Sequence, residues 1–151
     1  MVARASRARE QALSLAVDTN VIIGLVAGTQ AAAELASTVL EKHAERQGLL
    51  ICPIVYAELF AHPGWSKKEM DAFLRATTIG VQWEIAREVW EAAGSAWAEY
   101  AARRKRQPSS APRSLLADFA IGAHAAATGG LITGDAAFYR TNFPDLRLIT
   151  M

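Results

Sequence analysis

Four acidic residues stand in apolar surroundings, where an unpaired carboxylate is energetically costly. Asp18 directly follows the apolar run LSLAV, and Asp135 follows GGLITG. Glu58, in PIVYAELFAHPG, and Asp118, in RSLLADFAIGAHAAA, have mostly apolar neighbours three and four positions away. On a helix both carboxylates would therefore point toward the buried side. Four such acids repel one another unless a cation lies between them, and their oxygen atoms suit Mg²⁺ or Mn²⁺.

A hard cation held by carboxylates is an apparatus for hydrolysis of a phosphodiester bond. The metal polarises the phosphate and lowers the pKa of a bound water, which attacks in line. This chemistry needs no nucleophilic side chain. The sequence agrees, because it contains no Gly-x-Ser-x-Gly elbow, no Walker loop and no Gly-x-Gly-x-x-Gly fingerprint.

Each acid taken alone has a simpler interpretation. Asp18 and Asp135 can each be the N-cap of a helix, because Asp is a favoured capping residue. Glu58 can be a solvated helix acid if its side of the helix faces outward. Asp118 is the hardest of the four to explain without a site, and the four together favour one.

Short apolar runs alternate with stretches of helical periodicity, which is typical of βαβ units and a parallel sheet. Strands are expected at residues 13–17, 49–52, 78–81, 130–133 and 147–149. Helices are expected at residues 20–26, 30–47, 54–61, 66–76, 84–104 and 114–128. Ser66 and Glu69 form a capping-box pattern, and Gly48 is placed to end a helix. Asp18 and Asp135 would lie beyond the carboxyl ends of strands, where open α/β sheets place their sites.

The composition is that of an ordinary globular protein. The 151 residues fit one domain, with 52% hydrophobic and 21% charged residues and a net charge of +1. No apolar run reaches the roughly 18 to 20 residues of a membrane helix. The run before Asp18 is too short for a signal peptide, so we expect a cytoplasmic protein. Cys52 is the single cysteine, which excludes an internal disulfide and a cysteine-based zinc site.

Positive charge is unevenly distributed along the chain. Residues 1–12 carry three arginines and are expected to be a flexible basic extension. The segment RRKRQPSSAPRS is expected to be a loop, because its prolines and like charges oppose a helix. It can be a solvated loop or an arm that follows RNA phosphates with salt-sensitive affinity. Its candidate RNA-binding residues are Arg103, Arg104, Lys105, Arg106 and Arg113.

Aromatic and histidine residues near these segments have less specific interpretations. Trp83, Trp90 and Trp97 recur every seven residues and would form one stripe on a long helix. Such a stripe is usually core and next most often an interface. His62 would share the helix face of Glu58 if that helix persists to Pro63; a contact with a substrate phosphate is then favoured over a role as metal ligand. No catalytic histidine is assigned.

Four segments resemble, in order, the motifs of PIN-domain ribonucleases, and most closely those of VapC-like toxins from bacterial and archaeal toxin–antitoxin pairs. VDTNVII looks like the first family motif, and VYAELF like the helix that carries the family's Glu. LLADFAIGAHA looks like the helix of the next Asp, and LITGDAAF like the closing Thr-x-Asp-x-x-Phe motif. The resemblance covers nearly the whole chain, so residues 1–151 would form a single PIN-like nuclease domain.

The resemblance implies a catalytic site for Mg²⁺ or Mn²⁺ in which Glu58 is the fourth acid. The metal ligands would be Asp18, Asp118 and Asp135. Asn20 and Thr133 would orient these acids or the metal-bound water. The resemblance also implies a three-layer α/β sandwich, with a central, mostly parallel five-stranded sheet flanked by helices. A homodimer and a cognate antitoxin follow by the same analogy.

We therefore expect a metal-dependent endoribonuclease toxin that cleaves RNA by means of metal-activated water and is neutralised by a cognate antitoxin. Two alternatives stay open: a PIN-like nuclease of RNA maturation or DNA processing without an antitoxin, and a PIN module that binds RNA or protein without cutting. A haloacid-dehalogenase-like phosphatase is set aside, because it needs a second Asp where this chain has Asn20. Two features depart from the family: the long N-terminal extension, and the AHPG that follows Glu58.

Overall fold

The computed structural model of this protein describes residues 2–108, 110 and 113–151. The elements are, in chain order, α1 (Val2–Leu13), β1 (Leu15–Val17), α2 (Thr19–Ala27), α3 (Gln30–Gln47), β2 (Leu49–Ile51), α4 (Pro53–Leu59), α5 (Lys67–Ala76), β3 (Ile79–Val81), α6 (Arg87–Arg106), α7 (Leu116–Ala126), β4 (Leu131–Thr133), α8 (Ala136–Asn142) and β5 (Leu148–Thr150). The predicted strands and helices are all present, with ends shifted by a few residues. Helices α1 and α8 were not predicted.

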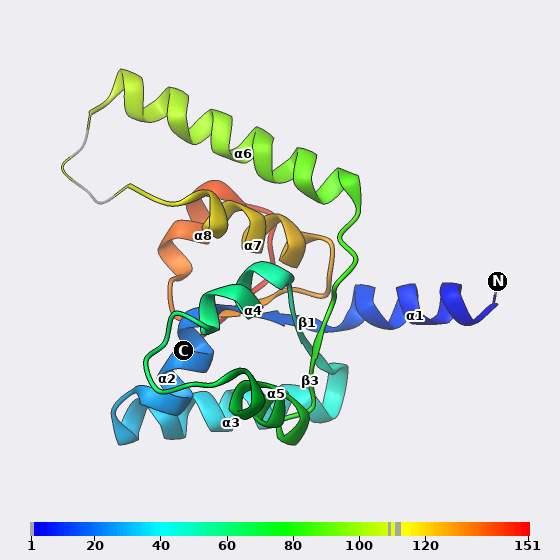
Figure 1. The fold of residues 1–151 in the computed structure, drawn as a ribbon. Coiled ribbons are helices and arrows are strands. Elements are labelled where there is room, and N and C mark those ends of the chain that lie inside the picture. Colours follow the sequence, from blue (N-terminus) through cyan, green and yellow to red (C-terminus); the bar gives the residue numbers. More distant parts are fainter. Residues whose placement is uncertain (1, 109, 111–112) are drawn as a thin grey trace.

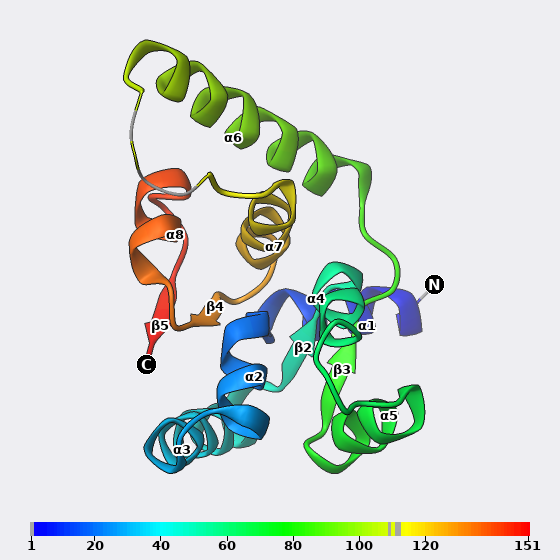
Figure 2. The ribbon, with the colours of Figure 1, turned by 60° about the vertical axis from the view of Figure 1, so that its left-hand side comes forward.

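The five strands form one sheet in the order β3-β2-β1-β4-β5, and every neighbouring pair is parallel. Helix α7, with α6 outside it, covers one face, and α3 and α5 lie on the other (Figures 1 and 2). The predicted α/β class with helices on both faces is thus confirmed, and the sheet is parallel throughout. The strand order changes direction between β1 and β4, which creates a switch point at their carboxyl ends.

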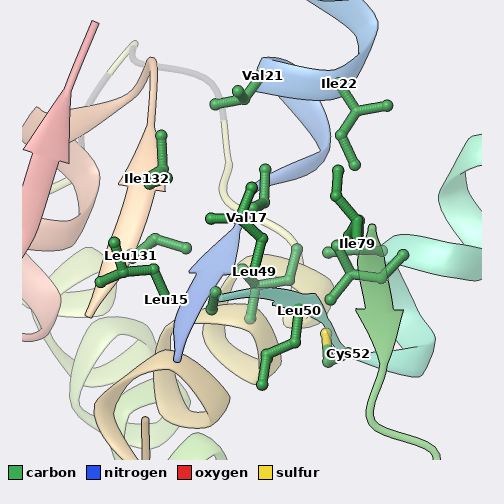
Figure 3. Packing of buried hydrophobic residues seen from close by; sticks show 14 of the residues in the cluster. Leu15, Val17, Val21, Ile22, Leu49, Leu50, Cys52, Ile79, Leu131 and Ile132 are labelled. Carbon is green, nitrogen blue, oxygen red and sulfur yellow. The ribbon is translucent and has the colours of Figure 1, made fainter. Parts of the chain in front are cut away.

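The three central strands form the core. All residues of β1, β2 and β4 are buried, because helices cover both faces of a parallel sheet. Figure 3 shows the side chains of Leu15, Val17, Leu49, Leu131 and Ile132 gathered between these strands. This two-sided burial explains why the strands are continuous apolar runs in the sequence instead of alternating patterns.

Local capping signals in the sequence hold in the structure. The Ser66 hydroxyl accepts the N–H of Glu69, and the Glu69 carboxylate accepts the N–H of Ser66, so α5 begins with a capping box. Gly48 follows α3 with a φ of 76°, a conformation that favours glycine. The capping box fixes where α5 begins, and Gly48 fixes where α3 ends before β2.

The N-terminal segment differs from the prediction. The expected flexible extension covered residues 1–12, and the first strand was expected to begin at Leu13. Residues 2–13 instead form α1, and the first strand begins at Leu15. Alanine, arginine and glutamate are good helix formers, which explains the local helix. Figure 1 shows α1 extending away from the rest of the chain.

The predicted loop from Arg103 begins later than expected. Helix α6 continues to Arg106, because cations are favourable at the negative end of a helix dipole. The guanidinium of Arg103 donates to Oδ1 of Asn142 in α8 at 2.6 Å. Four of the five predicted basic residues therefore lie on a helix, and only Arg113 lies in the segment that follows.

The prediction of a tryptophan stripe in the core is wrong. Trp83 precedes α6 and is 60% exposed, and Trp90 is 48% exposed. Trp97 alone is half-buried, with its ring 5.2 Å from that of Phe119. Helix α6 packs mainly along α7, and Ala93 is its buried residue. Among the described residues no helix is both long and apolar enough to cross a membrane.

Candidate active site

The sheet topology places the predicted acids around one edge of the molecule. Asp18 directly follows β1, and Asp135 is two residues beyond β4. Asp118 is the third residue of α7, which packs against β1 and β4, and Glu58 is next to the last residue of α4. The carboxyl ends of β1 and β4 meet at the switch point, so segments far apart in the sequence converge there.

Asp18 is the buried centre of this edge. Only 5% of the surface of this residue is exposed. Its Oδ2 accepts three hydrogen bonds, from the Thr133 hydroxyl at 2.8 Å, the Tyr139 hydroxyl at 3.0 Å and the Asn20 amide at 3.2 Å. All three donors are neutral, so they fix the orientation of the carboxylate without cancelling its charge.

Asp18 also occupies the N-cap position of α2, but its side chain makes no capping hydrogen bond there. The capping interpretation therefore does not account for the side chain. Burial raises the pKa of Asp18 above its ordinary value, and the hydrogen bonds from Thr133 and Tyr139 counteract this only in part. The negative charge of Asp118 raises the pKa further. A cation at this carboxylate would have the opposite effect.

The buried hydroxyl of Tyr139 responds to the charges of three of the four acids. Burial raises the pKa of Tyr139 above its ordinary value, and the charges of Asp18, Asp118 and Asp135 raise it further. Tyr139 therefore stays a neutral hydrogen-bond donor at any physiological pH. The charges of all three acids thus act on this one buried hydroxyl.

Two polar side chains join the segments that follow β1 and β4. The Thr133 hydroxyl, which donates to Asp18, accepts the N–H of Asp135 at 2.9 Å. Asn20, which also donates to Asp18, accepts the N–H of Gly134 through Oδ1 at 3.0 Å. Both residues named beforehand as supports thus contact Asp18 and the loop that carries Asp135.

Asp118 and Asp135 are less buried than Asp18. Asp118 is half-buried, and its Oδ2 accepts the N–H of Leu115 at 3.0 Å, at the start of α7. Asp135 is exposed and is the N-cap of α8, since its Oδ1 accepts the N–H of Phe138 at 3.4 Å. Each carboxylate thus has one oxygen bonded to its own helix, and among the described residues its second oxygen accepts no hydrogen bond.

Glu58 is half-buried and is connected to the first motif through its neighbour. Its Oε2 accepts a hydrogen bond from the hydroxyl of Thr19, the residue after Asp18. This bond joins α4 to the start of α2. His62 lies beyond the end of α4 and packs against the ring of Trp65, so it does not share the helix face of Glu58.

Comparison with known proteins decides the family. The family model of the PIN domain matches residues 15–144, which include all four acids. The chain belongs to the PIN-domain family. No curated protein sequence matches it.

One solved structure illustrates the shared fold. A chain in the crystal structure of VapBC2 from Rickettsia felis, bound to a DNA fragment from their promoter, is 21% identical to this PIN domain. The match covers 90% of this chain and 97% of that chain, with a TM-score of 0.58. At this level of identity the similarity is one of fold.

PIN-domain nucleases typically use a divalent metal ion, and the chemistry of this site fits one. In the described part of the chain, none of the four acids is paired with a lysine or arginine; the ion pairs there join Lys67 to Asp71 and Arg87 to Glu91. As arranged, however, no three His, Cys, Asp or Glu side chains among these residues lie close enough together to hold a metal. The donor types and the uncompensated charge fit Mg²⁺ or Mn²⁺.

Two contacts of the PIN domain's site were missed by the sequence analysis. Tyr139 lies four positions after Asp135, on a helix that was not predicted, and Thr19 was given no role. The i and i+4 spacing of Asp135 and Tyr139 could have indicated a shared helix face. Two of the predicted basic residues contact groups other than the acids: Arg103 bonds to Asn142, and Arg104 lies over the ring of Tyr100, 5.8 Å from its centroid.

Proposed function

We propose that this PIN domain is a metal-dependent endoribonuclease that hydrolyses RNA phosphodiester bonds. The observation that carries the proposal is the buried Asp18, whose Oδ2 is held by three neutral donors while Asp118 and Asp135 add negative charge nearby. A carboxylate that only capped a helix would gain nothing from this burial. A bound cation makes the arrangement favourable.

Asp18, Asp118 and Asp135 would be the ligands of Mg²⁺ or Mn²⁺. The ion, when bound, polarises the phosphate and lowers the pKa of a water. Thr133 and Asn20 keep the Asp18 carboxylate in one orientation, and they tie it to the loop that presents Asp135. Glu58, held by Thr19, completes the acidic site and offers an oxygen that can accept a proton from the attacking water.

We further propose that the protein is a cytoplasmic toxin, a homodimer, and the target of a cognate antitoxin. The support is the similarity of its fold to a chain of the Rickettsia felis VapBC2 structure. Residues 1–151 would act as one nuclease domain, with α1 as a basic appendage. The basic residues at the end of α6, with Arg113, would contact the RNA backbone.

RNA sequencing after brief expression in bacteria tests this function. We expect the wild-type chain to stop growth and to produce a limited set of new RNA ends that carry a 5′-phosphate. Asp18→Asn should produce neither effect. Asp145→Asn is the matched control, because Asp145 is exposed and lies in the turn between α8 and β5, which leads to the amino end of that strand.

The result also separates the alternatives. If expression of Asp18→Asn produced the same set of new RNA ends as the wild type, the proposed site would be ruled out. New ends without growth arrest would favour a nuclease of RNA maturation over a toxin. RNA binding without any new ends would favour a non-catalytic module.

A further inference from the structure

A second candidate site lies between the last turns of α6 and the segment that leads into α7. A cavity of about 430 Å³ is present there, within the roughly 300–1,000 Å³ of small-molecule sites. The residues that give it its chemistry are Trp97, Tyr100, Arg104, Lys105, Arg113 and Ser114. None of the four acids of the nuclease site lines it.

Two aromatic side chains form one wall of the cavity. The rings of Trp97 and Tyr100 are 5.8 Å apart, with their planes inclined by 34°. Both pack against the buried ring of Phe119, at 5.2 and 5.3 Å, which holds them in place. Each of the two residues is only half-buried, so part of each ring borders the cavity.

Positive charge surrounds this aromatic wall. Arg104, Lys105 and Arg113 line the cavity, and the described residues of its lining include no Asp or Glu. The hydroxyl of Tyr100 accepts the N–H of Ser114 at 2.9 Å, which ties the segment before α7 to α6. The cavity therefore offers apolar aromatic surface and cationic side chains together.

The cavity is adjacent in the chain to the nuclease site. Ser114 is followed by Leu115, whose N–H binds the carboxylate of Asp118. Four residues span at most about 14 Å even when fully extended, so Ser114 and Asp118 are no farther apart than that. A strand of nucleic acid held in the cavity can reach the acids within a few nucleotides.

We infer that this cavity binds one nucleotide of single-stranded RNA, with the base stacked on Trp97 and Tyr100 and the adjoining phosphates at Arg104, Lys105 and Arg113. The inference rests on the proposed RNA cleavage and adds a subsite that selects unpaired RNA. Aromatic side chains stack on unpaired bases, and cations follow the backbone. An acidic peptide would use the cations but would leave the aromatic wall without a partner.

Binding of fluorescein-labelled hexauridylate tests the subsite. The protein carries Asp18→Asn and the buffer contains EDTA, so that no cleavage occurs and binding alone is measured. We expect Trp97→Leu to weaken binding by about tenfold, in the range of one lost stacked base, and Trp97→Phe to bind within about twofold of the parent. Thermal unfolding confirms that each variant is folded.

Charge variants give an independent readout that does not disturb the aromatic packing. Lys105→Gln and Arg113→Gln should each weaken binding and reduce its dependence on salt, because fewer counterions are released. Lys68→Gln is the matched control, since Lys68 is exposed on α5, on the other side of the sheet. It should bind as the parent does.

Three outcomes would overturn the subsite: parent-like binding by Trp97→Leu, equal binding of a hexamer that lacks bases, or displacement of the RNA by hexaglutamate through the same residues. The last outcome would assign the cavity to an acidic peptide. Because all of these measurements are made without metal or cleavage, the subsite can fail while Asp18→Asn still abolishes nuclease activity. If the binding results are as expected but Asp18→Asn still cleaves RNA, the subsite stands and the proposed nuclease site is ruled out.

Discussion

At the residue scale, Oδ2 of Asp18 is the atom at which the site is organised. It accepts hydrogen bonds from three segments of the chain, contributed by Asn20, Thr133 and Tyr139. Such a buried carboxylate responds to the loss of a single donor, because hydrogen bonds to charged groups contribute about 1.5–3 kcal/mol each.

Tyr139→Phe removes only the hydroxyl that donates to Asp18. The hydrogen bond from Tyr139 lowers the pKa of Asp18, so its loss raises a pKa that burial has already raised. Because Asp18 must be ionised to bind a cation, the acidic limb of the pH profile of kcat/KM should shift to higher pH. The rate at neutral pH should fall by about tenfold, which corresponds to about 1.4 kcal/mol.

Tyr56→Phe is the control for this variant. Tyr56 also donates to a carboxylate, that of Asp71 at 3.0 Å, but away from the site. The pH profile of kcat/KM of Tyr56→Phe should match that of the wild type. Superimposable profiles for Tyr139→Phe and wild type would show that Tyr139 does not act on Asp18.

The four acids were predictable from the sequence because each interrupts an apolar segment. Tyr139 was not, since its contact with Asp18 spans 121 positions. Nor could the sequence show that Asp118 and Asp135 each use an oxygen at their own helix. Such details depend on how the elements pack.

At the element scale, α7 positions Asp118 and packs very closely against the C-terminal part of the chain. A Cβ atom added at Gly122 would lie 2.3 Å from the ring of Phe143. That ring is itself packed against Phe119 and Tyr139, at centroid distances of 6.3 and 6.4 Å. The ring therefore has little freedom to give way.

Gly122→Ala should lower the free energy of unfolding by about 1–3 kcal/mol, the usual cost of overpacking. It should also lower the cleavage rate, because the displaced α7 carries Asp118. Gly94→Ala is the control: no atom lies within 4 Å of its added Cβ, so the free energy should rise by up to about 1 kcal/mol. Urea unfolding measures both; equal effects of the two variants would contradict the close packing.

The elements themselves were largely predictable. Central strands are apolar on both faces, and α3 and α5 carry clear capping residues. Helix α8 was missed because seven residues show little helical periodicity; α4 is equally short but begins with a proline, which favours the start of a helix. The end of α6 was misplaced because like charges were taken to oppose a helix, whereas cations are favourable in its last turn.

At the scale of the whole molecule, the strand order β3-β2-β1-β4-β5 creates the site by bringing the ends of β1 and β4 together. The same packing buries His124 of α7, which is 3% exposed. Its Nε2 donates to Oε1 of Gln82 at 2.9 Å, and its Nδ1 has no partner among the described residues. Burial lowers the pKa of His124 to about 4 from an ordinary 6.5.

The stability of the protein should therefore depend on the protonation of His124. The unfolded chain takes up this proton near pH 6.5, and the folded protein only near pH 4. The contribution of neutral His124 to the free energy of unfolding is therefore complete above pH 6.5 and is lost as the pH falls toward 4. The full loss is about 3 kcal/mol. Unfolding free energies of wild type and His124→Gln, measured between pH 7 and 4, should converge on acidification; parallel curves would contradict this.

The most direct test is single-turnover cleavage of RNA by the purified protein, first freed of metal with EDTA and then supplied with Mg²⁺ or Mn²⁺. The wild type and Asp145→Asn should cut only when metal is present and should leave a 5′-phosphate and a 3′-hydroxyl. Asp18→Asn and Asp118→Asn should remain folded and show no cleavage. Wild-type cleavage by either variant with added Mg²⁺, or cleavage by the wild type in EDTA, would contradict the four-acid metal site.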